Sequence, residues 1–108
     1  MRVKKFLHTR MRVSDMDQTI NFYTNVLGLE VLERKVSPRG SHLAFLKVPN
    51  SEELIELCSF PSSGPVTVQE DLVHLAFQVL SVGEKDQHLI LSFFGNEGGS
   101  SCIDSSGQ

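Results

Sequence analysis

HTRMRVSDMDQTINFYTNVLGLEVLERK, residues 8–35, decides the fold because its hydrophobic period changes twice along the chain. Residues 6–13 alternate between two faces, which is the period of a β-strand. One face carries Phe6, His8, Arg10 and Arg12, and the other carries Leu7, Thr9, Met11 and Val13. The alternation predicts a strand with one polar and one apolar face.

A helix is expected to follow this strand. Ser14 begins it, and Asp17 stands three residues later in the manner of a capping box. Apolar residues then recur at helical spacing and predict a buried stripe: Met16, Ile20, Tyr23 and Leu27. Gly28 is expected to end the helix in a left-handed conformation. Residues 29–36 read as the next strand, which completes a strand–helix–strand unit.

Two more strands follow this unit. SPRGS, residues 37–41, contains Pro38 and Gly40, which are typical of a turn. Residues 42–48 are expected to form a hairpin with the strand over 29–36. Residues 53–60 are the next strand, with Leu54, Glu56 and Cys58 on one face. The predicted order is therefore β-α-β-β-β, an α+β arrangement.

The second half of the chain is expected to be less complete. A strand over 72–79 is followed by a weakly helical stretch over 81–94, and a Gly/Ser-rich tail is expected to be disordered. The predicted organisation within one domain, 1–108, is a first module over 1–60, a connection over 61–71, a partial second module over 72–94 and the tail over 95–108. The second half is therefore expected to be incomplete, or to be completed by a second copy of the chain.

Composition excludes several classes of partner. The chain has 108 residues, 21% of them charged, and a formal net charge of −3. This balance disfavours a nucleic-acid surface or an anionic-membrane surface. No apolar run is long enough to cross a bilayer, and the N-terminus lacks the features of a secretory signal. With two cysteines, of which Cys58 reads as a core residue, we expect a reducing cytoplasm.

Three polar side chains stand out by their strand phase: His8, Glu56 and His74. Each belongs to the less apolar side of its strand, so they converge if the strands curve around one concavity. Two imidazoles and a carboxylate are a common first shell for a catalytic divalent metal. Arg10 and Arg12 share the face of His8 and could hold an anionic substrate tail or pair with carboxylates.

The alternative is that these side chains have no ligand. A single histidine on a half-buried strand is more often a solvated or core residue than a metal ligand. His42 beside a turn and His88 on the predicted helix serve as internal comparisons, and both are expected to be solvated. The sequence has no phosphate-binding glycine loop and no G-x-S-x-G serine-hydrolase motif, so other catalytic chemistry has little support.

Four stretches of the sequence resemble glyoxalase I of the vicinal-oxygen-chelate superfamily: residues 8–35, LAFLKVP, LIELCSF and VQEDLVHLAFQV. The resemblance covers residues 6–79. It implies two βαβββ modules that form a curved sheet around a divalent metal, nickel or zinc, with His8, Glu56 and His74 as three of four ligands. Glu56 is also the carboxylate available for proton transfer, and Arg12 is expected to contact a glutathione carboxylate.

The implied reaction is a lyase reaction on the glutathione hemithioacetal of methylglyoxal, which yields S-lactoylglutathione. The implied protein is a cytoplasmic homodimer.

The sequence departs from the glyoxalase I pattern at two places that bear on the implied activity. Cys58, Ser59 and Phe60 stand where the family has an asparagine that contacts glutathione, and the fourth ligand has no counterpart, since Glu97 lies in the Gly-rich tail. We therefore expect weak or absent isomerase activity from the 108-residue chain alone.

Two other functions stay open. Two histidines and one carboxylate also suit a non-haem iron dioxygenase or another metal enzyme of the superfamily, such as an epimerase. A non-catalytic protein could use the same concavity to bind a small molecule.

Overall fold

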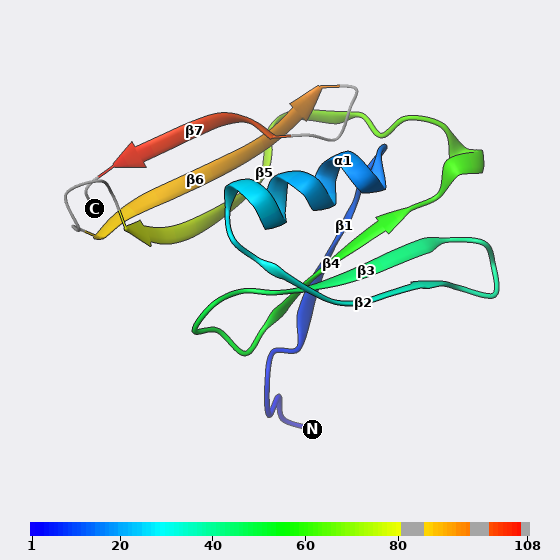
Figure 1. The fold of residues 1–108 in the computed structure, drawn as a ribbon, viewed down its shortest axis with the longest axis horizontal. Helices are drawn as coiled ribbons and strands as arrows, with labels where there is room; N and C mark the ends of the chain where they lie inside the picture. Colours follow the sequence, from blue (N-terminus) through cyan, green and yellow to red (C-terminus); the bar gives the residue numbers. More distant parts are fainter. Residues whose placement is uncertain (81–85, 96–99, 107–108) are drawn as a thin grey trace. The chain divides into compact units, whose positions relative to one another are not determined.

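The computed structural model describes residues 1–80, 86–95 and 100–106. They form two compact units, Met1–Pro65 and Val66–Gln108, which are described separately. Figure 1 shows the elements of both. No helix in the described ranges is long and apolar enough to cross a membrane. The predicted limits of the two modules and of their connection stay predictions.

The first unit has the predicted β-α-β-β-β order. Its elements are β1 (His8–Arg12), α1 (Met16–Asn21) with a π-helical continuation (Phe22–Val26), β2 (Glu30–Val36), β3 (His42–Lys47) and β4 (Leu54–Ser59). The four strands form one sheet in the order β1-β4-β3-β2 (Figure 1). β1 runs parallel to β4, and the other neighbours are antiparallel. A short 3-10 helix, Pro61–Ser63, follows β4.

The helix begins one residue later than the sequence indicated. Asp15 is the N-cap, and its side chain accepts a hydrogen bond of 2.9 Å from the Gln18 backbone N–H. The prediction that Ser14 and Asp17 form the capping box is therefore wrong. Asp17 instead accepts a hydrogen bond from Arg34 on β2 at 3.1 Å. Gly28 has φ +79 and ends the helix in the left-handed region as predicted.

The core of this unit lies between the helix and one face of the sheet. Its buried side chains come from the helical stripe, from the loops at its ends and from the two central strands: Val13, Met16, Tyr23, Leu29, Ala44, Leu46, Ile55 and Leu57. The antiparallel register pairs Ala44 with Leu57 and Leu46 with Ile55, so these four side chains share the helix-facing side. Burial raises the pKa of the Tyr23 phenol.

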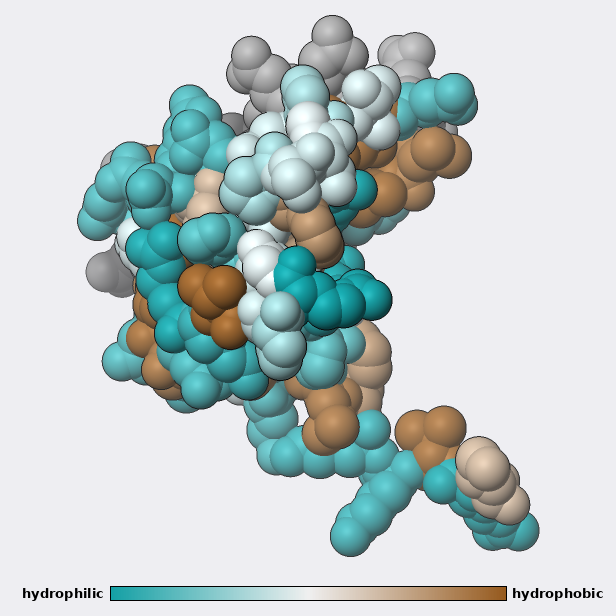
Figure 2. Space-filling model, turned by 90° about the vertical axis from the view of Figure 1, so that its right-hand side faces the viewer, coloured by the Kyte–Doolittle hydropathy of each residue, from teal (hydrophilic) through white to brown (hydrophobic). Residues whose placement is uncertain are grey.

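Residues 1–7 precede β1 and extend away from the sheet. Their hydrophobic side chains are exposed: Met1, Val3, Phe6 and Leu7. The N-terminal segment forms the arm that projects at the bottom of Figure 2. Strand pairing begins only at His8. The alternation that the sequence shows over 6–13 is therefore longer than the strand.

The second unit is a three-stranded antiparallel sheet of β5 (Val68–Leu80), β6 (Asp86–Gly95) and β7 (Ser100–Ser106), in that order. The predicted helix over 81–94 is wrong for 86–94, and 81–85 lie outside the described residues. Leu89 and Leu91 are both buried, which is the period of a strand. The tail, expected to be disordered, contains β7, whose pairing with β6 outweighs its polar composition.

We predict that Leu57→Ala destabilises the first unit by about 2–5 kcal/mol, because truncating a fully buried leucine leaves a cavity. Leu57 has 0% relative exposure in the middle of β4, next to Glu56. The free energy of unfolding in urea measures the effect. Leu32→Ala is the matched control, because Leu32 is 51% exposed. Equal losses in the two variants would contradict this packing.

Candidate functional site

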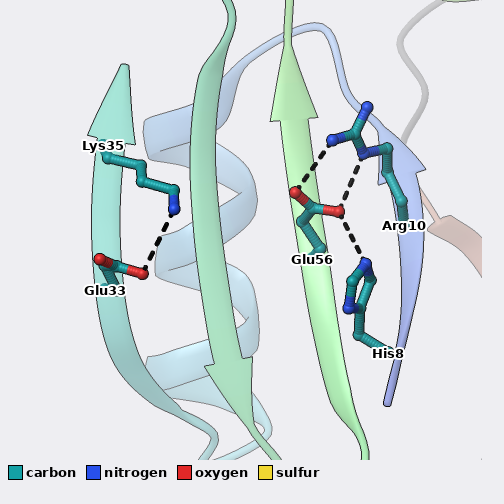
Figure 3. Close-up of polar contacts among 5 residues, drawn as sticks. All are labelled: His8, Arg10, Glu33, Lys35 and Glu56. Atoms are coloured by element: carbon teal, nitrogen blue, oxygen red, sulfur yellow. Dashed lines mark hydrogen bonds and ion pairs between the residues drawn. The ribbon is translucent and has the colours of Figure 1, made fainter. Parts of the chain in front are cut away.

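Glu56 lies in the middle of β4 on the face that points away from the helix. Strand register brings Arg10 of β1 directly beside it on one side and Phe45 of β3 on the other. Residues paired across neighbouring strands project to the same face of a sheet. Figure 3 shows the result, with the side chains in front of the sheet and the helix behind it. The site is thus set by two registers.

Both oxygens of the Glu56 carboxylate have cationic partners. Arg10 Nε donates to Oε1 at 2.9 Å, and Arg10 Nη2 donates to Oε2 at 3.1 Å. His8 Nε2 lies 3.3 Å from Oε1 (Figure 3). The two arginine contacts form the parallel fork that makes guanidinium–carboxylate pairs strong and directional. His8 and Glu56 are therefore brought together as predicted, with Arg10 as a third member.

The three members differ in their access to water. The Glu56 side chain is 3% exposed, whereas those of Arg10 and His8 are 55% and 41% exposed. An ionised carboxylate removed from water needs charged or hydrogen-bonding partners that offset its lost hydration. Arg10 supplies them from the solvent side. The hydrogen bond from Arg10 lowers the pKa of Glu56, and the positive charges of Arg10, His8 and Lys35 add to this lowering against the effect of burial.

Phe45 forms an apolar surface beside the carboxylate. The His8 ring meets it edge to face with 5.8 Å between centroids, and Lys35 Nζ lies 5.5 Å from the centre of the Phe45 ring. Lys35 also lies 3.8 Å from Glu33 Oε1 on its own strand (Figure 3). Contacts of this kind restrict the imidazole and the ammonium to one side of the ring. Phe45 therefore orients His8 toward Glu56.

The remaining predicted site residues lie elsewhere. Arg12 is the last residue of β1, opposite Cys58, and it is exposed on the same face as Arg10. His74 belongs to the second unit, where it is exposed on β5 and pairs with Ser92. Its convergence with the first unit stays a prediction. In the described part of the chain, no three His, Cys, Asp or Glu side chains cluster as a metal site would need. Glu97 lies outside the described residues.

His8 and Glu56 nevertheless have the donor chemistry of half a metal site. An imidazole nitrogen and a carboxylate oxygen 3.3 Å apart are ligands that zinc and nickel accept together. The pair also has the rigidity that such a site requires, because Glu56 is held between two strands. The two residues fit a divalent metal as two of its ligands, at a carboxylate that Arg10 also binds.

Comparisons with known proteins identify the family of the chain. The family model described as the Glyoxalase/Bleomycin resistance protein/Dioxygenase superfamily matches residues 5–89. The chain belongs to this superfamily. The expected α+β fold of the glyoxalase type is thereby confirmed. The superfamily match includes both units, since it extends from the arm before β1 into β6.

Two lactoylglutathione lyases are each similar to about half of the chain. The lactoylglutathione lyase of Salmonella typhimurium is 42% identical over 53 residues, which are 47% of this chain and 39% of that protein. The lactoylglutathione lyase of Haemophilus influenzae is 39% identical over 54 residues, 49% of this chain and 40% of that protein. The chain thus matches about two fifths of the length of these relatives.

A solved structure within the superfamily is similar over more of the chain. It is that of the trypanothione-dependent glyoxalase I of Leishmania major, with a TM-score of 0.67 and 27% sequence identity. The similarity covers 87% of this chain and 83% of that one. The identification as a glyoxalase I-like superfamily member is therefore confirmed.

Sequence reasoning recognised only part of what Arg10 does. The alternation places Arg10 on the face of His8, where it predicts either a contact with an anionic substrate or a pair with a carboxylate. The partner could not be chosen from the sequence, because it depends on the parallel register of β1 with β4. The buried state of Glu56 was missed for the same reason. A signal was present in the short apolar run that surrounds Glu56, which is typical of a central strand.

We predict that metal-free protein loses stability in acid through Glu56. The folded-state pKa of Glu56 is lowered, so its ionisation stabilises the fold above about pH 4.3, the ordinary glutamate value, and this contribution disappears as pH falls through the lowered pKa. The difference in unfolding free energy between wild type and Glu56→Gln should be largest near neutral pH and shrink in acid.

Urea titrations across pH, in the presence of a chelator, measure this difference. Glu33→Gln is the control, because it removes an exposed carboxylate from the same face of the sheet. A gap between wild type and Glu56→Gln that stays constant from neutral pH to pH 3 would contradict the stabilising role of the ionised carboxylate.

Proposed function

We propose that the protein is a metal-dependent lyase of the glyoxalase I type. Its substrate would be the hemithioacetal that a 2-oxoaldehyde such as methylglyoxal forms with glutathione, and its product would be S-lactoylglutathione. One observation carries the proposal: a carboxylate with 3% side-chain exposure, held 3.3 Å from an imidazole on a sheet of this superfamily. The lactoylglutathione lyases among its relatives support the choice of reaction.

Glu56 is the proposed catalytic residue. The reaction moves a proton between two neighbouring carbon atoms, so it needs a base that accepts the proton from one carbon and returns it to the other. A carboxylate fixed between two strands can do both with little movement. Its burial excludes bulk water from the transferred proton.

His8 and Glu56 would hold the metal, with His74 as a third ligand. Glyoxalase I enzymes depend on a metal in general. A bound divalent ion, nickel or zinc in this proposal, supplies Lewis acidity that polarises the substrate carbonyl. His74 would come from the second unit of the same chain or of a second copy. The second of these sources is the reason for proposing a homodimer.

Arg12 is the proposed contact for the anionic end of the thiol. It is exposed on the same face as Glu56, one pair of residues further along β1. A guanidinium binds a carboxylate through two parallel hydrogen bonds, which suits the carboxylates of glutathione. Cys58 and Ser59, where the family has an asparagine, are both buried. Arg12 therefore has the larger part in recognising the thiol.

The direct test is turnover of methylglyoxal with glutathione by the metal-loaded protein. We expect nickel or zinc to restore activity after chelation, and Glu56→Gln to lower kcat by about 10²–10⁴-fold, the usual contribution of a general base. A comparison of kcat/KM for the hemithioacetals of glutathione and of trypanothione identifies the thiol that the protein prefers. Arg12→Met should raise KM for the preferred thiol more than it lowers kcat.

His8→Ala and His42→Ala form the matched pair of controls. Both histidines are exposed strand residues of the first unit, but only His8 contacts Glu56. His8→Ala should lose bound metal, and His42→Ala should keep it. Metal-loaded protein that converts no hemithioacetal, or turnover that survives Glu56→Gln, would overturn the proposed function.

A further inference from the structure

Arg10 binds the carboxylate that the proposed metal would need. Its Nε and Nη2 each donate to a different oxygen of Glu56, at 2.9 and 3.1 Å. His8 approaches Oε1 as well, at 3.3 Å. A carboxylate that accepts a guanidinium fork directs lone pairs of both oxygens at the arginine, and these are lone pairs that a metal ion would also use.

The burial of Glu56 limits the directions from which a metal ion can reach its carboxylate. The Glu56 side chain is 3% exposed, and its strand lies between β1 and β3. A metal that binds it must reach the face of the sheet that points away from the helix, where the Arg10 guanidinium lies (Figure 3). A cation at that position also repels a divalent ion through space, and the repulsion is stronger where water is excluded.

The Arg10 side chain, unlike that of Glu56, can turn away from the site into water. Its side chain is 55% exposed, and β1 is an edge strand of the four-stranded sheet in the described part of the chain. A guanidinium on a long flexible stem recovers its hydration when it turns into water. The carboxylate can thus keep its place while its cationic partner changes.

We propose that Arg10 is an internal cation that occupies Glu56 in the metal-free protein and is displaced when a divalent metal binds. The inference rests on the proposed role of Glu56 as a metal ligand and adds a regulatory residue to that site. Arg10 keeps the buried carboxylate paired, and the metal must break the fork before it can bind. Arg10 therefore lowers the metal affinity of the site and sets the metal concentration at which it fills.

The first test compares the affinity of the chelator-treated, 108-residue wild-type protein for zinc with that of three variants, two at Arg10 and one at a control position. Arg10→Met removes the fork and should tighten zinc binding at least about tenfold, a change that corresponds to roughly 1.4 kcal/mol, within the range of a hydrogen-bonded charge pair. Arg10→Lys keeps a positive charge without the fork and should give an intermediate affinity. Competition with a chromophoric chelator measures all four dissociation constants.

Arg34→Met is the matched control. Arg34 is 49% exposed and also pairs with a carboxylate, Asp17, but on the helix side of the same sheet. Its substitution changes net charge by the same amount and should leave zinc affinity within about twofold of wild type, since exposed charges at a distance are screened. Equal affinities of wild type and Arg10→Met, or weaker binding by Arg10→Met, would overturn the inference.

The second test needs no variant and so does not depend on the folding of Arg10→Met. In ¹⁵N NMR of the wild-type protein, the Arg10 Nε–H resonance should be that of a hydrogen-bonded group without metal. It should move to the position of a solvated arginine as zinc is added. A resonance that stays in place at saturating zinc would show that metal and fork coexist, which overturns displacement.

The outcomes separate the inference from the proposed function. Zinc binding with equal affinity in wild type and Arg10→Met leaves the metal site intact and removes only the role of Arg10. If neither protein binds zinc, nickel or cobalt, both the inference and the metal-dependent function are wrong. Tighter binding by Arg10→Met, with no turnover of the hemithioacetal by either metal-loaded protein, would support the inference and contradict the proposed lyase activity.

Discussion

The pairing of Arg10 with Glu56 is the interaction on which the candidate site depends. A carboxylate in the middle of a buried strand costs several kcal/mol in lost hydration unless charged partners surround it. Here the partners come from the neighbouring parallel strand, β1. Arg10 lies opposite Glu56, and His8 lies two residues before Arg10. The same register that completes the sheet thus also makes the buried charge tolerable.

One face of the first sheet packs the hydrophobic core, and the other carries the side chains of the candidate site. The helix-facing side packs aliphatic side chains such as Leu46 and Leu57, which have 0% relative exposure. The opposite side carries Glu56, His8 and Arg10, with Phe45 as the apolar surface that orients the imidazole. Because the chain alternates between these faces along each strand, each functional side chain of β4 is flanked by core residues. Rigid positioning of the carboxylate follows from this alternation.

Much of this arrangement could be predicted from the sequence because hydrophobic period identifies elements within a short window. The order β-α-β-β-β, the stop at Gly28 and the shared face of His8 and Arg10 all follow from local pattern. Partners depend on register instead, which local pattern does not contain. The N-cap illustrates this limit at short range, since Ser14, Asp15 and Asp17 are all acceptable cap residues and only geometry selects Asp15.

The second half was predicted less well for a related reason. Leu89 and Phe93 have helical spacing, but Leu89 and Leu91 have strand spacing, and pairing with β5 decides between them. Cross-strand hydrogen bonds likewise order β7, which has only one aliphatic residue, Ile103. In both segments cross-strand pairing overrides the local signal, as is usual for strands.

A double-mutant cycle on the metal-free protein tests the central pairing most directly. The free energies of unfolding of wild type, Arg10→Met, Glu56→Gln and the double variant yield the coupling between the two side chains. Our account predicts a coupling of about 1.5–3 kcal/mol, the range for hydrogen bonds to charged groups, with Arg10→Met alone less stable than the double variant. Additivity within about 0.5 kcal/mol would contradict it.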